Sequence, residues 1–220
     1  MQNFDAHPGR GSKERGWPDV LYASSVFEID LHVHTRLRSH DSSLTPEELV
    51  AEAKRLGQAA ICITEHNDCW TADEARRLSE MHGIPVLRGM EIGTDVGHVL
   101  AFGIGRFTPE MFRADALRLI ADSEGAALVL AHPMRPPGFG RPLAELVGLF
   151  DGYEVLNGDE SRLAAHSAEA IARQFGLAPT GGSDAHSRQG LGRCHTVFET
   201  AVGTDHGLAW RSEGGGRGRR

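Results

Sequence analysis

Two histidines two positions apart, His32 and His34, stand at the end of an apolar segment of alternating polarity. Side chains alternate faces along a strand, so these two imidazoles would project to the same side. Imidazole is the commonest metal ligand in proteins; it suits Zn, Fe, Ni and Cu, and tolerates Mn. The spacing therefore predicts part of a metal site, which ligands elsewhere in the chain must complete.

Later segments that read as short apolar strands also carry an imidazole or a carboxylate at one end. These residues are Glu65, His66, Glu91, His98, His132, Asp184 and His186. Taken alone, each has a plain structural explanation as a capping residue or a satisfied core histidine. Their recurrence at the ends of successive strands makes independent structural explanations improbable and predicts a shared metal-binding rim.

In chain order, the motifs are His-x-His, a following His or Asp, Thr-Glu-His, Gly-x-Glu, Ala-His-Pro and Gly-Ser-Asp-Ala-His. This set resembles the PHP (polymerase and histidinol phosphatase) family of metal-dependent phosphoesterases, over roughly residues 26 to 200. The resemblance implies an α/β fold, namely a distorted seven-stranded β/α (TIM-like) PHP barrel in a single domain. It also implies up to three metals at the C-terminal rim of that barrel.

Carried over position by position, the resemblance implies two to three divalent transition-metal ions, Mn, Zn or Fe. The first would be held by His32, His34, Glu91 and Asp184, the second by Glu91, His98 and His132, and the third by His40, His66 and His186. Glu91 would then bridge two ions. Only one of the adjacent residues His40 and Asp41 need bind, and the six-residue offset of His40 from His34 favours the histidine.

The implied reaction is hydrolysis of a phosphate ester by attack of a metal-bound hydroxide on phosphorus. Glu91, Asp184 and His186 are the expected catalytic residues. Three divalent ions outweigh two carboxylates and a bridging hydroxide, so the site would favour a dianionic phosphate monoester over a neutral amide. Arg135 and Arg193 follow rim motifs and are candidates to bind phosphate oxygens, although a plain surface position fits each equally well.

The expected partner is a small phosphate ester, either a phosphorylated metabolite or a nucleotide. One alternative is a nuclease or phosphodiesterase that acts on short single-stranded oligonucleotides. Another is a non-catalytic PHP module that binds metal structurally, but the complete ligand set argues against it. The leaving group, the general acid and the oligomeric state are not indicated by the sequence.

Composition narrows the class of protein further. The chain has 220 residues, one ordinary domain in size, and its formal net charge of -7 argues against a broad cationic face for duplex nucleic acid. Its three cysteines include no Cys-x-x-Cys pair, which indicates a reducing compartment. We find no long apolar run and no signal pattern at the N-terminus, so we expect a cytoplasmic protein with no membrane partner.

Between the strands the apolar residues recur with helical period, as a β/α alternation requires. Thr45, Pro46 and Glu48 predict an N-cap, a first helical position and a capping box, with Gly57 as the stop. Further helices are predicted at 71–82, 109–124, 142–149 and 160–175. The last of these has a predicted buried stripe of Leu163, Ala164, Ala168, Ile171 and Phe175, followed by Gly176 as the stop.

The first strand of the domain is predicted to separate two faces. Phe27, Ile29, Leu31 and Val33 would lie beneath helices, whereas Glu28, Asp30, His32 and His34 would face the barrel. A buried carboxylate needs a partner, so Asp30 is predicted to orient a ligand histidine through its second ring nitrogen.

The two ends of the chain differ from the middle in composition. Residues 1–25 and 203–220 are rich in Gly, Ser, Pro and charge and are expected to be disordered, leaving 26–202 as the folded domain.

Overall fold

We describe residues 5–8, 26–135, 141–203 and 208 of a computed structural model of the chain. The strands are β1 Asp5–Pro8, β2 Phe27–Val33, β3 Ala60–His66, β4 Val86–Thr94, β5 Gly97–Phe102, β6 Ala127–Leu130, β7 Gly152–Asn157, β8 Ala178–Gly182 and β9 Cys194–Phe198. The helices are α1 Pro46–Arg55, α2 Ala72–His82, α3 Ala114–Glu124, α4 Leu143–Leu146 and α5 Arg162–Phe175. Two short 3₁₀ helices are η1 Pro109–Phe112 and η2 Val147–Leu149.

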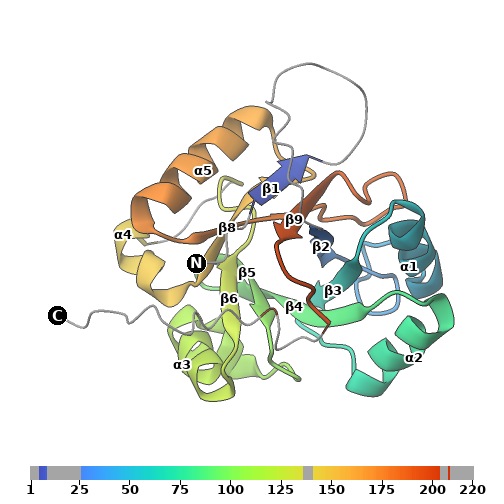
Figure 1. Cartoon of the computed structure of the whole chain (residues 1–220). Coiled ribbons are helices and arrows are strands. Elements are labelled where there is room, and N and C mark those ends of the chain that lie inside the picture. Colours follow the sequence, from blue (N-terminus) through green and yellow to red (C-terminus); the bar gives the residue numbers. More distant parts are fainter. Residues whose placement is uncertain (1–4, 9–25, 136–140, 204–207, 209–220) are drawn as a thin grey trace.

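The strands form one mixed sheet in the order β1-β9-β2-β3-β4-β5-β6-β7-β8, which curls into a barrel surrounded by helices (Figure 1). The residues after β8 close the ring on β2, because the Asp184 amide donates to the His32 carbonyl at 2.7 Å and the His34 amide to the Ala185 carbonyl at 3.1 Å. The predicted distorted barrel is confirmed. Within the described residues the sheet has nine strands rather than seven, since β9 pairs with β2 and β1 pairs with β9.

The β/α alternation is interrupted at one point. Strands β4 and β5 form an antiparallel hairpin without an intervening helix, and β5 also pairs antiparallel with β6. Because of this reversal, His98 lies near the start of β5 and still reaches the rim at which the parallel strands end. The hairpin therefore accounts for the one expected ligand that opens a strand instead of ending one.

Local capping chemistry matches the predicted helices closely. Helix α1 has the expected capping box, in which Thr45 accepts from the Glu48 amide and Glu48 accepts from the Thr45 amide. The predicted 109–124 helix is instead split into η1 and α3, because Arg113 between them is extended. In α5 the predicted stripe is wrong at Leu163, which is 78% exposed. Ala168 is buried there as expected.

Three apolar clusters support the barrel. Two lie between the sheet and its helices, one under α1 and α2 and one under α3 and α5. The third consists of strand side chains from around the ring together with Leu208, and therefore fills the barrel interior below the rim. Its members from β2 to β5 include Ile29, Leu31, Cys62, Leu87, Leu100 and Phe102.

The interior cluster corrects the predicted faces of β2. Ile29 and Leu31 point into the barrel, whereas Val33 packs beneath the helices. The register of β2 against β3 shifts between Asp30 and Val33, as at a β-bulge. One extra residue reverses the facing of everything after it, so apolar side chains fill the barrel below while His32 and His34 enter it above.

The expected domain boundaries stay predictions. Asp5–Pro8, within the segment expected to be disordered, forms β1 and pairs antiparallel with β9. Leu208, within the expected tail, is fully buried in the interior cluster. Among the described residues, no helix combines the length and apolarity needed to cross a membrane.

Candidate metal centre

The barrel rim brings together every predicted ligand except His40. They form three groups in which the potential ligand atoms lie within 4.8 Å of one another. The groups are His32, His34, Glu91 and Asp184; Glu91, His98 and His132; and His34, His66 and His186. Two residues, Glu91 and His34, each belong to two groups, so the groups are continuous.

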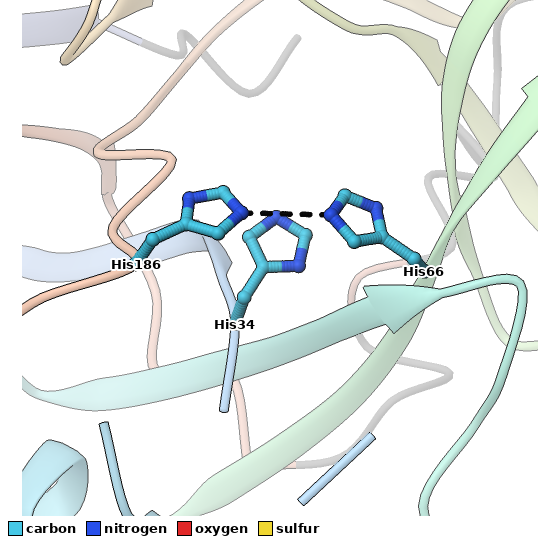
Figure 2. A group of neighbouring side chains, drawn as sticks. All are labelled: His34, His66 and His186. Carbon is cyan, nitrogen blue, oxygen red and sulfur yellow. Dashed lines mark hydrogen bonds between the residues drawn. The ribbon is translucent and has the colours of Figure 1, made fainter. Parts of the chain in front are cut away.

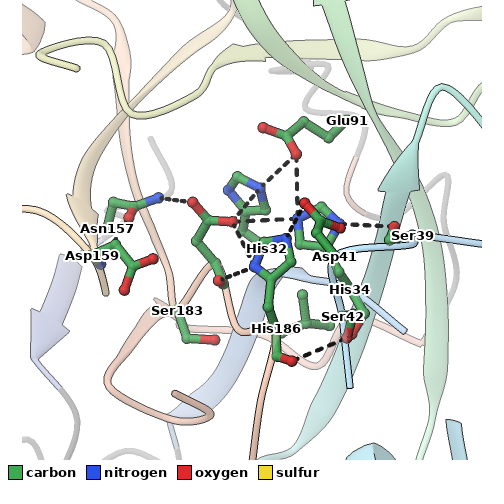
Figure 3. A network of polar contacts seen from close by, with 12 residues as sticks. His32, His34, Ser39, Asp41, Ser42, Glu91, Asn157, Asp159, Ser183 and His186 are labelled. Carbon is green, nitrogen blue, oxygen red and sulfur yellow. Dashed lines mark hydrogen bonds and ion pairs between the residues drawn. The ribbon is translucent and has the colours of Figure 1, made fainter. Parts of the chain in front are cut away.

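The first group is fully buried and has the dimensions of a metal site. His32 Nε2 and His34 Nε2 each lie 3.3 Å from Glu91 Oε2 and 3.4 Å from Asp184 Oδ1. Four ligands about 2.1 Å from a tetrahedral ion would be separated by about 3.4 Å. Figure 3 shows the two imidazoles converging toward Glu91.

Three atoms of this group, His32 Nε2, His34 Nε2 and Glu91 Oε2, are buried and form no well-directed hydrogen bond among the described residues, although His66 Nδ1 lies 2.9 Å from Glu91 Oε2. Leaving such polar atoms unsatisfied is costly, and a divalent cation at their centre would satisfy all three together. The donor set of imidazoles and carboxylates therefore fits a transition-metal ion.

The second group uses the other oxygen of Glu91. Glu91 Oε1 lies 2.7 Å from His98 Nδ1 and 2.9 Å from His132 Nε2. The His98 side chain is 45% exposed, whereas His132 is buried. Glu91 thus presents one oxygen to each group, which is the arrangement needed to bridge two ions.

The third group lies toward solvent. The Nε2 atoms of His66 and His186 are 3.5 Å apart, with the ring of His34 between them (Figure 2). His40, which was predicted to share this group with His66 and His186, is exposed and joins none of the groups found among the described residues, so its role as a ligand stays a prediction. Its neighbour Asp41 instead places Oδ2 3.1 Å from His66 Nε2 and 3.3 Å from His186 Nε2.

Two of the candidate ligands have unusual backbone conformations. His132 has φ of 29° and Asp184 has φ of 54°, in the left-handed region that non-glycine residues rarely adopt. Such conformations persist only where surrounding contacts enforce them, and they are concentrated at functional sites. Here they redirect two side chains at the points where β6 and β8 end.

The electrostatics of the first group favour a cation. Burial opposes the charge of Asp184, but the nearby His32 and His34 hold the pKa of this carboxyl well below its usual range. Burial likewise opposes the charge of Glu91, and His32 and His132 outweigh it to keep the pKa of Glu91 low. Burial works to lower the pKa of His32, but Asp184, Glu154 and Glu91 raise it well above its ordinary value. A proton and a metal ion would compete for this imidazole.

A second layer of side chains orients the ligands, and part of it was missed by the sequence analysis. His32 Nδ1 lies 3.0 Å from Glu154 Oε1, and His34 Nδ1 lies 3.3 Å from the Ser39 hydroxyl, which donates to Glu65 at 2.6 Å. The available signal for Glu154 was a carboxylate within an otherwise apolar strand.

The orienting role predicted for Asp30 is wrong. Its Oδ1 accepts from the backbone amides of Ser183 at 2.8 Å and His32 at 3.2 Å, and its carboxylate is not the partner of the His32 ring. Burial raises the pKa of Asp30 to about 6, despite the opposing hydrogen bonds from Ser183. Asp30 therefore joins β2 to the residues after β8, and helps to close the ring beneath the site.

The two predicted phosphate-binding arginines differ in their surroundings. Arg135 donates to Asp184 Oδ2 at 2.9 Å and to Asn157 Oδ1 at 3.3 Å, so it holds a candidate ligand in place. Arg193 lies 3.7 Å from Asp159, and both side chains are more than half exposed. Residues 136–140, which follow Arg135, lie outside the described residues.

Comparison with known proteins yields consistent family matches. The model of the PHP domain matches residues 30–177, and that of a PHP-associated region matches residues 163–208. A 3',5'-nucleoside bisphosphate phosphatase of Chromobacterium violaceum is 30% identical over 128 residues, which cover 56% of this chain and 41% of that protein. The matched part is therefore less than half the length of that relative.

Two solved structures are similar to this chain. A two-domain protein of Bacteroides vulgatus, described as containing a predicted PHP-like metal-dependent phosphoesterase, is 25% identical with a TM-score of 0.62, covering 83% of this chain and 59% of that one. PsfC of Pseudomonas syringae is 23% identical with a TM-score of 0.65, covering 85% and 88% of the two chains. The second likeness concerns the fold alone.

Proposed function

The chain belongs to the PHP domain family, and on that premise we propose that it is a metal-dependent phosphoesterase that hydrolyses phosphate monoesters of small metabolites or nucleotides. The observation that carries the proposal is the continuous set of three ligand groups joined by Glu91 and His34. Binding of two to three ions, Mn, Zn or Fe, would make this rim strongly positive and suited to a phosphate dianion.

Divalent ions in such a site lower the pKa of a water molecule so that it can attack phosphorus, and they stabilise the phosphoryl and leaving oxygens. The residues of the chain hold and orient those ions. Glu91 and Asp184 supply ionised carboxylates, and Glu91 offers one oxygen to each of two groups.

His186 is set up to present one nitrogen to the third group. Its Nδ1 lies 2.8 Å from the carbonyl oxygen of Asp184, so it donates there and leaves Nε2 with a free lone pair. The same Nε2 lies 3.3 Å from Asp41 Oδ2. In the proposed site, Asp41 and His186 therefore hold the ion closest to solvent, on the side from which a substrate would approach.

The arginines divide between positioning and binding. Arg135 neutralises Asp184 Oδ2, while its side chain stays 39% exposed and available to a substrate oxygen. Arg193 is the freer of the two, because its ion pair with Asp159 is long and exposed. We expect Arg193→Ala to raise KM for a monoester with little change in kcat, and Arg135→Ala to lower kcat as well. Wild-type kinetics in both variants would show that metals alone hold the substrate phosphate.

The proposal can be tested with a substrate panel. Protein loaded separately with Mn, Zn, Fe or Co should hydrolyse p-nitrophenyl phosphate faster than its bis ester, and inorganic phosphate should inhibit competitively. A nucleoside 3',5'-bisphosphate belongs in the panel because the Chromobacterium violaceum relative is named as a phosphatase of that class. Preference for the bis ester or for short oligonucleotides would favour a phosphodiesterase or nuclease instead. Metal binding without turnover of any ester would favour a non-catalytic module.

A further inference from the structure

One buried carboxylate contacts two of the candidate metal groups without belonging to either. Glu154 lies in the middle of β7 and is fully buried. Its Oε1 lies 3.0 Å from His32 Nδ1, and its Oε2 accepts from the backbone amide of His132 at 2.7 Å. The Asn157 side-chain amide donates to Oε2 as well, at 3.0 Å. Both oxygens of Glu154 are therefore used as hydrogen-bond acceptors.

The contact with His32 decides which ring nitrogen carries the proton. Because Glu154 Oε1 is an acceptor, Nδ1 of a neutral His32 must be the donor, and Nε2 then has a free lone pair. That Nε2 is the buried atom without a partner that faces Glu91 and Asp184. The geometry needed for binding a metal thus depends on the carboxylate behind the ring.

The contact with His132 acts on the backbone. His132 is held at a positive φ, and the short hydrogen bond from its amide to Glu154 is one of the contacts that enforce this conformation. In this conformation His132 Nε2 lies 2.9 Å from Glu91 Oε1. A single carboxylate therefore orients a ring in the first group and a backbone turn in the second.

We propose that Glu154 is a positioning residue that selects the metal-binding tautomer of His32 and ties the first metal group to the second. The proposal rests on the metal centre of the proposed function and deepens it, but it does not depend on which phosphate ester is hydrolysed. Metal binding in the first group would then depend on Glu154, although Glu154 itself contacts no ion.

Replacement by glutamine gives a sharp test, because an amide of the same shape has one acceptor and one donor. The orientation of Asn157 is fixed by its neighbours, since its Oδ1 accepts from the Asp159 amide at 3.0 Å. Two donors, His132 N and Asn157 Nδ2, face the Oε2 position of residue 154, and one donor, His32 Nδ1, faces the Oε1 position. The oxygen of the glutamine should therefore face the pair, and its NH₂ group should face His32 Nδ1.

A donor opposite Nδ1 favours the other tautomer of His32, in which Nε2 carries the proton and cannot bind a metal. We expect Glu154→Gln to weaken zinc binding in the first group about 10- to 100-fold, the range typical for loss of a residue behind a metal ligand. The second group keeps all its own side chains, so it should still bind zinc.

The experiment measures zinc alone, not activity. Purified Glu154→Gln and wild-type chains would be titrated with zinc against a competing chelator, and bound zinc counted by elemental analysis. Nitrogen-15 NMR of the imidazoles would report the His32 tautomer. Glu28→Gln is the control, because Glu28 lies near the opposite end of β2 and is 38% exposed. The control should match wild type in zinc content and tautomer.

The outcomes are separable. Wild-type affinity and an unchanged His32 tautomer in a folded Glu154→Gln variant would overturn this inference and leave the phosphoesterase proposal standing. Absence of zinc binding by the wild type would overturn this inference, and the substrate panel with Mn, Fe and Co would then decide the phosphoesterase proposal by itself. If the variant does not fold, the metal-free wild type still decides: a neutral His32 must carry its proton on Nδ1 before any zinc is added, and protonation at Nε2 would refute the role of Glu154.

Discussion

Replacing Asp41 by Asn tests which residue completes the third metal group. Asp41 Oδ2 lies 3.1 Å from His66 Nε2 and 3.3 Å from His186 Nε2. Both Asp41 and the adjacent His40 are exposed, and neither belongs to the three groups found among the described residues. The Asp41 side chain is 59% exposed, so its removal costs little packing. We therefore expect its main effect to appear only when metal is bound.

The magnitude follows from mass action. A metal present at 100 times its Kd stabilises the fold by about 2.7 kcal/mol, and a 100-fold loss of affinity at the same concentration leaves about 0.4 kcal/mol. We use 100-fold because even residues behind the ligands are worth about 10- to 100-fold. The loss of about 2.3 kcal/mol corresponds to a fall in Tm of about 5–9 °C for a domain of this size.

Thermal unfolding with and without a chelator supplies the assay. Asp41→Asn should have a lower Tm than wild type in manganese or zinc and the same Tm after chelation, and His40→Ala should match wild type in both conditions. A metal-dependent loss in His40→Ala with none in Asp41→Asn would restore the histidine as the ligand. A loss of equal size with and without metal would show that Asp41 acts only as a hydrogen-bond partner of the histidines.

Three further predictions address the bridge, the pH dependence and the packing of the site. Glu91→Gln should lower kcat on the order of a hundredfold or more in a protein that still folds by circular dichroism. The control is His166→Ala, exposed on α5, which should retain the wild-type rate. Near-normal turnover in Glu91→Gln would exclude the bridge. Hydrogen bonds from Arg55, and then from Arg188, lower the pKa of Glu52 to about 2, below its ordinary value of 4.5. The ionised Glu52 therefore stabilises the fold fully above about pH 4.5, and this contribution is lost as pH falls through about 2. Because both arginines are more than half exposed, Glu52→Gln should cost only about 1–2 kcal/mol at pH 7 in urea unfolding, with the gap closing near pH 2; a gap that does not change with pH would contradict the assignment. Finally, Gly182→Ala would place a Cβ 2.3 Å from His32 Cβ and 2.9 Å from Glu154 Oε1, and should lower the free energy of unfolding by about 3 kcal/mol, measured by calorimetry. The control Gly148→Ala, with open space around its Cβ, should have little effect. Equal stabilities of the two variants would mean that the strands can separate at Gly182 at no cost.

Much of the site could be predicted from the sequence, because its features depend on the types and spacing of neighbouring residues. His32 and His34 stand two residues apart at the end of β2, and β3, β4, β5, β6 and β8 each bring a candidate ligand to the rim. The helices between the strands are specified by near neighbours, such as the capping box of Thr45 and Glu48. Such features depend on a few adjacent residues, so residue types and spacing suffice to predict them.

The tertiary structure decided what depends on register and on distant partners. The register shift in β2 lets Ile29 and Leu31 face the barrel interior on the same strand as His32, which a strict period of two cannot anticipate. In the turn after β2, Asp41 contacts His66 and His186, a pairing that the six-residue offset of His40 from His34 did not predict.

Orientation of the ligands was also settled only in three dimensions. Glu154 reaches His32 from a strand 122 positions later in the chain, and Arg135 pairs with Asp184 across the rim. Closure of the barrel creates these contacts by bringing the end of β8 against β2 and β7 beside it. Residue types along the sequence determined which groups could bind metal, and the closed ring determined which nitrogen and which oxygen each one presents.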